Sequence, residues 1–244
     1  MSASLLEARD LSVTIGRTAL LTDINLELHA GEVLAVVGEN GAGKSTLLRA
    51  LSGELRPSSG HVTLGGLPLV AYSALELARR RAVLSQDHHV SFSFTALEVA
   101  RMGRHPYGEA NASEIALEAL RLCDAAHLET RVFATLSGGE RQRARLAQLA
   151  VQAPRIALLD EPLTHLDPAH QARLLAWARG EADAGRSVVL TLHDPNWAAC
   201  HCDRLLFLHG DGRWQLGTPA DLLTPAALEA LYGPGTAALW QQKA

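Results

Sequence analysis

One glycine-rich segment constrains the fold of this chain more than any other part of the sequence. It consists of Gly38, Glu39, Asn40, Gly41, Ala42, Gly43, Lys44, Ser45 and Thr46. The preceding run, 33–37, is short, apolar and rich in valine, which predicts a buried strand. The run 46–51 that follows has the pattern of a helix. The spacing G-x-x-x-x-G-K-[ST] between a strand and a helix predicts a P-loop, which binds phosphate groups.

The residue types of this loop explain how it would bind a nucleoside triphosphate. Glycine lets the backbone bend tightly and bring its N–H groups against phosphate oxygens, and the next helix directs its positive end at the same anion. We expect Lys44 to reach the β- and γ-phosphates and the hydroxyl of Ser45 to ligate Mg²⁺. The alternative is a glycine-rich turn before a buried helix, which the two matching flanks disfavour.

Composition and charge exclude several classes of protein. The chain has 244 residues, 48% of them hydrophobic, which suits one α/β domain with a small inserted subdomain. Its 22 basic and 26 acidic residues give a net charge of −4, which argues against a nucleic-acid partner. An odd number of cysteines, 3, does not suggest a disulfide framework. We find no apolar stretch of about 18 residues and no signal peptide, so we expect a soluble, cytoplasmic chain.

The remaining sequence predicts an α/β fold whose sheet combines two kinds of strand. Segments in which polar and apolar residues alternate predict antiparallel strands at one edge, whereas short apolar runs predict buried parallel strands. The antiparallel candidates are 11–15, 24–28 and 61–64, and the buried candidates are 33–37, 82–85, 156–159 and 188–192.

Between residues 87 and 135 the pattern becomes helical. Helices are expected over 95–102 and 113–124, and Ser113 is the expected N-cap of the second. We therefore expect a single domain over 1–244. Its nucleotide-binding core would consist of 1–86 and 136–244, with 87–135 as an inserted helical subdomain.

A second segment has the features of a phosphate-facing helix end. Ser137 and Glu140 have the spacing of a capping box before a long helical pattern over 141–151. A well-capped helix is the simpler interpretation. Gly138 and Gly139 add backbone N–H groups that an anion can approach closely, which a cap does not need. One chain thus has two phosphate-facing helix ends but a single P-loop.

Three polar residues follow two of the buried strands. Asp160 is placed at the end of a strand to hold Mg²⁺ through water, and Glu161 to orient or deprotonate an attacking water molecule. The alternative is an ordinary pair of helix-capping carboxylates. His193 follows the next buried strand, where ligands of parallel sheets bind, so we expect it to contact the γ-phosphate rather than serve as a core histidine.

Together these features resemble the ATP-binding subunit of an ABC transporter over almost the whole chain. The P-loop, Gln86 as the Q-loop residue, the signature 136–140, Asp160 with Glu161, and His193 occur in the order of that family. A P-loop alone is common to many NTPases, whereas a P-loop with the signature L-S-G-G-E is highly specific.

The resemblance implies ATP and Mg²⁺ as cofactors and a second copy of the chain as partner. Two copies would enclose two ATP molecules, with the signature of each acting on the ATP bound by the other. The residues expected to act across this dimer are Ser137, Gly138, Gly139 and Asp167. Gln86 would contact the metal and couple it to the permease. Closure on ATP and opening after hydrolysis would move that membrane partner.

The chain departs from the family pattern at three places. Most members have an aromatic residue near Ile15 that stacks on adenine, and this chain has no aromatic residue before Tyr72. Aliphatic side chains would then contact the base, and selectivity for adenine would be loose. In the D-loop, 164–167, His165 is unusual and could make activity depend on pH. Glu39 replaces a common proline, and we expect this change to be tolerated.

Two segments, 78–86 and 92–107, resemble importers of the iron-chelate, haem and cobalamin group, especially the haem importers. The resemblance implies haem import, with ferric siderophore or cobalamin as alternatives. It further implies permease subunits, a periplasmic substrate-binding protein that acts indirectly, and a peripheral location on the cytoplasmic face of the inner membrane. The apolar residues Phe92, Phe94, Met102 and Tyr107 would form a permease-docking surface or pack inside the subdomain.

A soluble ABC ATPase that acts on DNA or ribosomes is the alternative from another class. DNA-repair members have long coiled coils between the P-loop and the signature, and 47–136 has no sustained heptads. Ribosome-acting members usually have two such domains in one chain. The sequence therefore favours transport.

Overall fold

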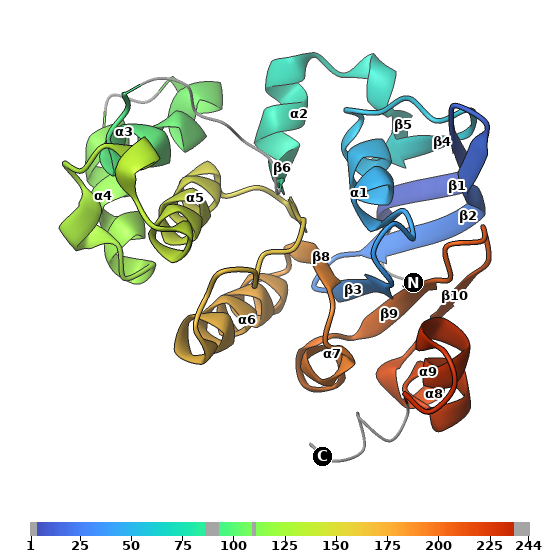
Figure 1. Ribbon diagram of the computed structural model, residues 1–244. Helices are drawn as coiled ribbons and strands as arrows, with labels where there is room; N and C mark the ends of the chain where they lie inside the picture. The colour runs from blue at the N-terminus through green and yellow to red at the C-terminus, as the bar shows by residue number, and fades with distance from the viewer. Residues whose placement is uncertain (1–3, 86–92, 109–110, 237–244) are drawn as a thin grey trace.

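The computed structural model describes residues 4–85, 93–108 and 111–236, which form two sheets and the helices around them (Figure 1). One sheet has four antiparallel strands in the order β2-β1-β4-β5. These strands are β1 (Ser4–Ile15), β2 (Thr18–His29), β4 (Ser59–Leu64) and β5 (Leu67–Pro68).

Strands β1 and β2 are longer than the sequence predicted. Their pairing continues across polar residues at which the register of the two strands shifts. Asp10 (φ 48°) and Asp23 (φ 49°) adopt left-handed backbone conformations where the register shifts. The amide of Asp10 donates to Oδ1 of Asn25 (3.1 Å), and the amide of Asp23 donates to Oγ of Ser12 (2.9 Å). These bonds hold the two bulged strands together.

The second sheet has six strands in the order β10-β9-β3-β8-β7-β6. Five neighbouring strands are parallel, and β10 pairs with β9 in the antiparallel sense. Their bounds are β3 (Val33–Gly38), β6 (Arg81–Leu84), β7 (Ile156–Leu159), β8 (Ser187–Leu192), β9 (Arg204–Leu208) and β10 (Trp214–Gly217). The predicted α/β fold, which combines antiparallel and parallel strands, is confirmed.

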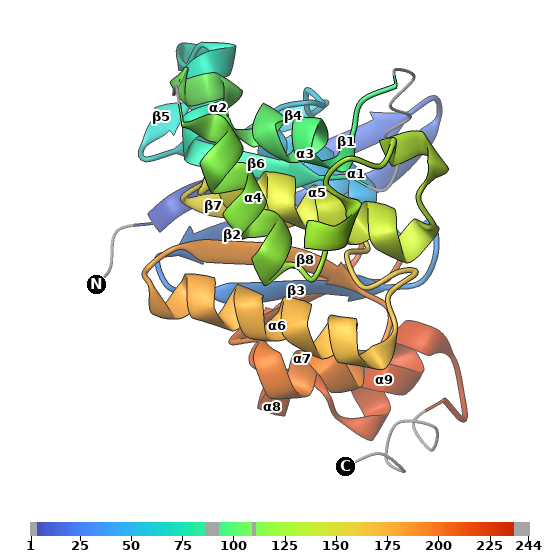
Figure 2. The same ribbon diagram turned by 90° about the vertical axis from the view of Figure 1, so that its left-hand side faces the viewer.

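Strand β3 lies between two apolar layers, which explains why it has no polar face. Val33, Ala35 and Val37 belong to the core on one side, and Leu34 and Val36 to the core on the other. Figure 2 shows α6 (Pro168–Asp183) and α7 (Pro195–His201) on one side of β3 and β8, with β1, β2 and α1 (Lys44–Ser52) on the other.

The other helices form a group beside the sheets and a short tail. The group contains α3 (Ala96–Arg101), α4 (Ala112–Leu122) and α5 (Gly138–Gln152), which share an apolar core and lie together in Figure 1. α2 (Ala74–Arg80) leads into β6, while α8 (Pro219–Leu222) and α9 (Pro225–Tyr232) form the tail. In the described ranges, we find no helix with both the length and the apolar character needed to cross a membrane.

Most helices begin at a side chain that accepts a hydrogen bond from the first turn. The side chains that do so belong to Ser73, Thr95, Ser137, Asp167, Asp194, Thr218 and Thr224. The expected cap Ser113 is wrong, because α4 begins one residue earlier and Asn111 occupies the N-cap position. Asn111 and Ser113 are both of residue types that cap helices, so residue type alone does not decide between them.

Candidate functional site

The candidate site lies at the carboxyl ends of three adjacent parallel strands. β8 pairs with β3 on one side and with β7 on the other, so the segments that follow these strands meet at one edge. A cavity of about 480 Å³ opens there. It is lined by Leu20, Asn40, Gly41, Gly43, Lys44, Ser45, Thr46, Glu161 and His193. The structure thus brings together three segments that the sequence predicted to be neighbours.

The glycine-rich loop has the backbone of an anion cradle. Gly41 (φ 84°) and Gly43 (φ 97°) adopt conformations that favour glycine, and a Cβ on Gly41 would extend into open space. Gly38 is constrained differently, because a Cβ there would lie 2.4 Å from the carbonyl oxygen of Leu208. Gly43 is the N-cap of α1 and supplies no side-chain cap. The first-turn N–H groups of α1 are therefore left for a ligand.

Lys44 is buried at the base of this cradle. Its Nζ donates to the carbonyl oxygens of Gly38 (2.7 Å) and Glu39 (2.8 Å). The amide of Ala42 also donates to the carbonyl of Glu39 (3.2 Å), so position 39 contributes to the loop through its backbone. Burial lowers the pKa of Lys44, and the carboxylates of Glu161 and Asp160 act in the opposite direction. The ammonium group is therefore held beside two carboxylates at the cavity.

A threonine that the sequence analysis did not single out holds the two carboxylate residues in place. Thr191 of β8 donates from Oγ1 to Oδ1 of Asp160 (3.0 Å), and the same oxygen accepts from the amide of Glu161 (2.6 Å). Thr191 and Asp160 are both buried. The only signal in the sequence was a hydroxyl within an apolar strand pattern.

Glu161 and His193 face each other across the site. Oε1 of Glu161 lies 3.0 Å from Nε2 of His193, so two residues predicted at separate strand ends form a pair. Glu161 has φ 46°, a conformation that costs free energy for a residue with a side chain. The hydrogen bond of its amide to Thr191 stabilises that conformation. The sequence predicted both positions but not their contact.

The signature residues do not line the cavity formed by the P-loop of the same chain. In Figure 1, α5 lies among the helices on the left, whereas α1 lies on the right beside the antiparallel sheet. Ser137 caps α5 in a complete capping box with Glu140. A Cβ on Gly138 would lie 3.1 Å from the His165 ring, and one on Gly139 would lie 2.9 Å from the His165 carbonyl oxygen.

Close packing is thus a second reason for glycine at positions 138 and 139. His165 has φ 65°, and Asp167 caps α6 through the amide of His170 (3.0 Å). Gln86 lies outside the described residues. Leu20 is the residue of the antiparallel sheet that lines the cavity, and Ile15 is 52% exposed at the end of β1. An aliphatic side chain, Leu20, therefore lines the cavity on the side of the antiparallel sheet.

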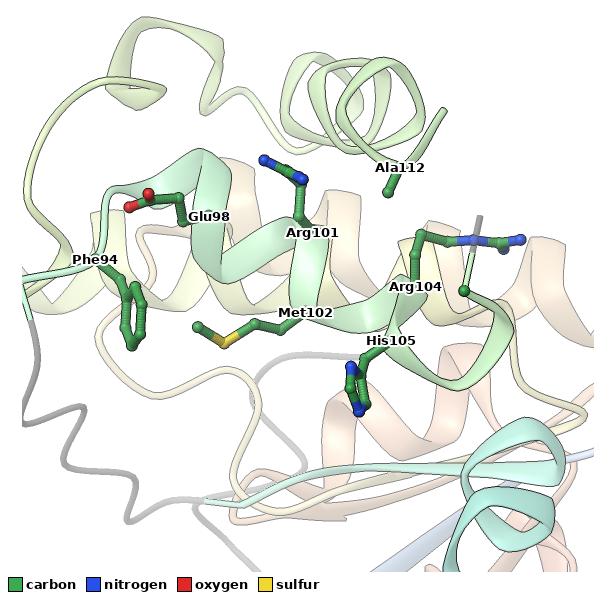
Figure 3. Close-up of a pocket in the computed structure, with 8 residues that line it drawn as sticks. Phe94, Glu98, Arg101, Met102, Arg104, His105 and Ala112 are labelled. Carbon is green, nitrogen blue, oxygen red and sulfur yellow. The ribbon is translucent and has the colours of Figure 1, made fainter. Parts of the chain in front are cut away.

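A second cavity, of about 570 Å³, opens on the helical group (Figure 3). It is lined by Phe94, Glu98, Arg101, Met102, Arg104, His105, Gly108 and Ala112. Figure 3 shows Phe94 and Met102 on the same side of α3, with the Met102 side chain extending toward Phe94.

Tyr107 is placed differently from Phe94 and Met102. Its ring lies below the guanidinium groups of Arg104 (4.3 Å) and Arg79 (5.9 Å), and its hydroxyl donates to the carbonyl of Gln152 (3.0 Å). Tyr107 therefore packs within the chain, whereas Phe94 and Met102 line a cavity at the surface. Phe92 lies outside the described residues.

Comparison with known proteins gives consistent matches over the chain. The family described as ABC transporter matches residues 21–164. The chain is 46% identical to Hemin import ATP-binding protein HmuV of Pseudomonas fluorescens (strain Pf0-1), over 94% of this chain and 92% of that protein. It is 43% identical to the protein of the same name from Bordetella avium (strain 197N), over 93% of this chain and 92% of that protein.

Solved structures match nearly the whole fold. An ATP binding subunit of an ABC transporter superposes with a TM-score of 0.82 and 26% identity, covering 98% of this chain and 99% of that one. The structure of cbiO1 from Clostridium perfringens, part of the ABC transporter complex cbiONQ, gives a TM-score of 0.77 and 25% identity, covering 98% and 99%.

Proposed function

The chain belongs to the ABC transporter family as an ATP-hydrolysing subunit, and we propose that the transporter it drives imports haem. The observation that supports this cargo is similarity to hemin import ATP-binding proteins. Identities of 43–46% extend over at least 93% of this chain and 92% of those proteins. The resemblance covers the segments beside the second cavity as well as the nucleotide-binding motifs.

Within the first cavity, the residues suit distinct parts of a bound nucleotide. The P-loop backbone and Lys44 would hold the phosphates, and Ser45, Asp160 and Gln86 would hold Mg²⁺. Their oxygen atoms are the ligands that Mg²⁺ prefers, and Asp160 lies near enough to Lys44 to affect its pKa, so the residues present fit the ion. Bound Mg²⁺ would neutralise charge that develops on the phosphates.

Glu161 is the proposed base that orients a water molecule for attack on the γ-phosphate and accepts its proton. The hydrogen bond from its amide to Thr191 and the contact with His193 hold its carboxylate at the cavity. His193 is proposed to donate to the γ-phosphate when the carboxylate turns toward water. The reaction would thus use two strand ends that the fold fixes side by side.

We further propose that the active unit contains two copies of the chain. Ser137, Gly138, Gly139 and Asp167 lie outside the cavity of their own chain, which leaves them available to complete the cavity of a second copy. ATP would stabilise the closed pair because each nucleotide contacts both copies.

The helical subdomain is the proposed contact with the permease. Its cavity presents Phe94 and Met102, with Met102 37% exposed, and apolar side chains in a concave surface suit the insertion of a partner segment. In this arrangement the chain is peripheral to the cytoplasmic face of the membrane. A periplasmic substrate-binding protein would deliver haem from the other side.

Uptake into liposomes tests the proposal. Liposomes would contain this chain with the permease that assembles with it, and haem-loaded or cobalamin-loaded binding protein would be offered outside. We expect ATP-dependent haem uptake that the Glu161→Gln variant abolishes. Uptake of cobalamin alone would contradict the cargo and leave the ATPase role intact. Uptake of neither would favour a siderophore importer or a soluble role.

A further inference from the structure

His170 lies where three parts of the fold meet, and its ring nitrogens contact all three. It occupies the first turn of α6, with a side chain that is 15% exposed. Nδ1 lies 2.8 Å from Oδ2 of Asp167, and the His170 amide donates to Oδ1 of the same carboxylate (3.0 Å). One histidine thus holds the D-loop aspartate at both oxygens.

The other ring nitrogen has two partners with opposite requirements. Nε2 lies 3.1 Å from a terminal guanidinium nitrogen of Arg143 on α5 and 3.2 Å from Oδ2 of Asp124, which follows α4. Arginine can only donate, so its contact requires a lone pair on Nε2. An ionised aspartate can only accept, so its contact requires a proton there. Because Nδ1 keeps its proton for Asp167, Nε2 gains one only when the ring becomes an imidazolium.

The charged groups around the ring come from every element packed against it. In the described ranges these are Asp167, the N-cap of α6, Arg173 in the second turn of α6, Arg143 of α5, and Asp124, which also pairs with Arg173 (3.3 Å). The hydrogen bond from the His170 amide lowers the pKa of Asp167, and Asp124 also faces the guanidinium of Arg173. Both carboxylates are therefore negatively charged near neutral pH.

The remaining neighbours of the ring are uncharged near neutral pH. The thiol of Cys123 lies beside Arg143, and burial raises its pKa to about 11. Behind the ring is a small crevice between α5 and α6, whose apolar lining includes Leu146, Leu166, Leu174 and Trp177. Among the side chains named here, imidazole is the type whose charge ordinarily changes between pH 5 and 8.

We propose that His170 is a positioning residue for the D-loop and that ring protonation changes the element to which the D-loop is tied. The neutral ring links Asp167 to Arg143 on the signature helix. The imidazolium links Asp167 to Asp124 at the end of α4 and repels Arg143. The inference rests on the proposed function, because Asp167 is assigned there to the ATP of the second copy.

The consequence for hydrolysis follows from the packing of the D-loop. His165 of that loop contacts Gly138 and Gly139 at the start of α5, so the D-loop and the signature form one surface. The neutral ring adds a second connection between the D-loop and α5. This connection keeps the D-loop and the signature in the relative positions in which they would meet the ATP of the second copy. ATP hydrolysis is therefore faster with the neutral ring and declines toward acidic pH.

The test is the pH profile of ATP hydrolysis by the full chain between pH 5.5 and pH 8.5, the range in which histidine changes charge. The wild type should lose activity on the acidic side, and His170→Asn should remove most of that loss. The Asn amide can still donate to Asp167 but has no charge to gain. We expect the affinity for ATP to change less than twofold. The matched control is His127→Asn, an exposed histidine of the helical group, which should keep the wild-type profile.

Two further variants make the test independent of the effect of His170→Asn on folding. Asp124→Asn removes the acceptor of the imidazolium, so the midpoint of the ring titration should move to lower pH. Arg143→Gln removes a repulsive charge, so the midpoint should move to higher pH. NMR of the His170 ring proton measures both midpoints without ATP or a permease, so failure of the haem proposal leaves this readout intact.

Opposite shifts of the two midpoints, together with a flattened profile for His170→Asn, would support the proposal. Midpoints that stay at the wild-type value in both variants would overturn the exchange of partners. An acidic loss of activity that persists unchanged in folded His170→Asn would overturn its connection to hydrolysis.

Discussion

At the scale of single residues, Glu161 has the central part in the proposed hydrolysis of ATP. Its carboxylate contacts His193, and its amide is fixed by Thr191, so it is the proposed base. Glu161→Gln keeps the shape of the side chain but removes the basic oxygen. General base catalysis contributes roughly 10²–10⁴-fold, so phosphate release should fall by about a hundredfold or more while ATP binding persists.

The control for this variant is Glu118→Gln, which changes an exposed glutamate paired with Arg121 on α4. Phosphate release at saturating ATP and equilibrium binding of ATP are the two measurements. Turnover of Glu161→Gln within a factor of two of the wild type would show that another group accepts the proton.

Thr191 gives a second prediction at this scale. Thr191→Val removes the hydroxyl and leaves the Asp160 carboxylate and the Glu161 amide without that partner. A buried polar group that loses its partner costs about 1–3 kcal/mol, so the free energy of unfolding should fall by that amount and hydrolysis should slow. Thr191→Ser keeps the hydroxyl and should restore both. Denaturant unfolding would measure the stability, and phosphate release would measure hydrolysis. A Thr191→Val variant with unchanged stability and unchanged hydrolysis would contradict the assigned role.

Residues also show what the sequence could and could not predict about the site. Lys44, Ser45, Asp160, Glu161 and His193 could be identified because each follows a buried strand or lies in a spaced motif. The contact of Glu161 with His193 could not be predicted, because it depends on how β7 and β8 align in the sheet. The role of Thr191 was hidden for the same reason, since a single hydroxyl leaves the apolar pattern intact.

At the scale of elements, the start of α5 is under two constraints. Its glycines were predicted from the need for accessible N–H groups, and the structure adds the close approach of His165. Gly139→Ala would place a Cβ 2.9 Å from the His165 carbonyl oxygen, a backbone atom that moves only with the D-loop. We expect this variant to lower both thermal stability and ATP hydrolysis.

The matched control is Gly180→Ala in the last turn of α6, where an added Cβ meets no atom within 4 Å. Alanine there should stabilise the chain by roughly 0.5–1 kcal/mol, because glycine is unfavourable inside a helix. Thermal unfolding of both variants checks the pair. A Gly139→Ala variant as stable and active as Gly180→Ala would contradict the packing argument.

Elements were predictable where their pattern is strong and less so where tertiary contacts set their ends. The buried strand before the P-loop was predicted at its observed place because both of its faces are covered. β1 and β2 extend beyond 11–15 and 24–28, because Asp10 and Asp23 form bulges that interrupt the alternation on which the prediction relied. The start of α4 was misplaced because Asn111 and Ser113 are both suitable caps by residue type.

At the scale of the whole molecule, the central claim is that one chain contributes two half-sites to two different nucleotides. The P-loop, Glu161 and His193 meet at one cavity, whereas Ser137, Gly138 and Gly139 lie outside it. A chain that worked alone would have no evident use for the second set. The sequence indicated this through two phosphate-facing helix ends, and only the fold shows that they are apart.

Mixed dimers measure this claim directly. One preparation combines Lys44→Ala with Ser137→Arg, each on a different copy, and the other combines wild type with the double variant. If the signature acts across the dimer, the first preparation retains one intact site and the second retains none. ATP hydrolysis by purified, differently tagged mixed dimers should therefore survive only in the first. Hydrolysis that survives only in the second would mean that each chain completes its own site, and would contradict the account.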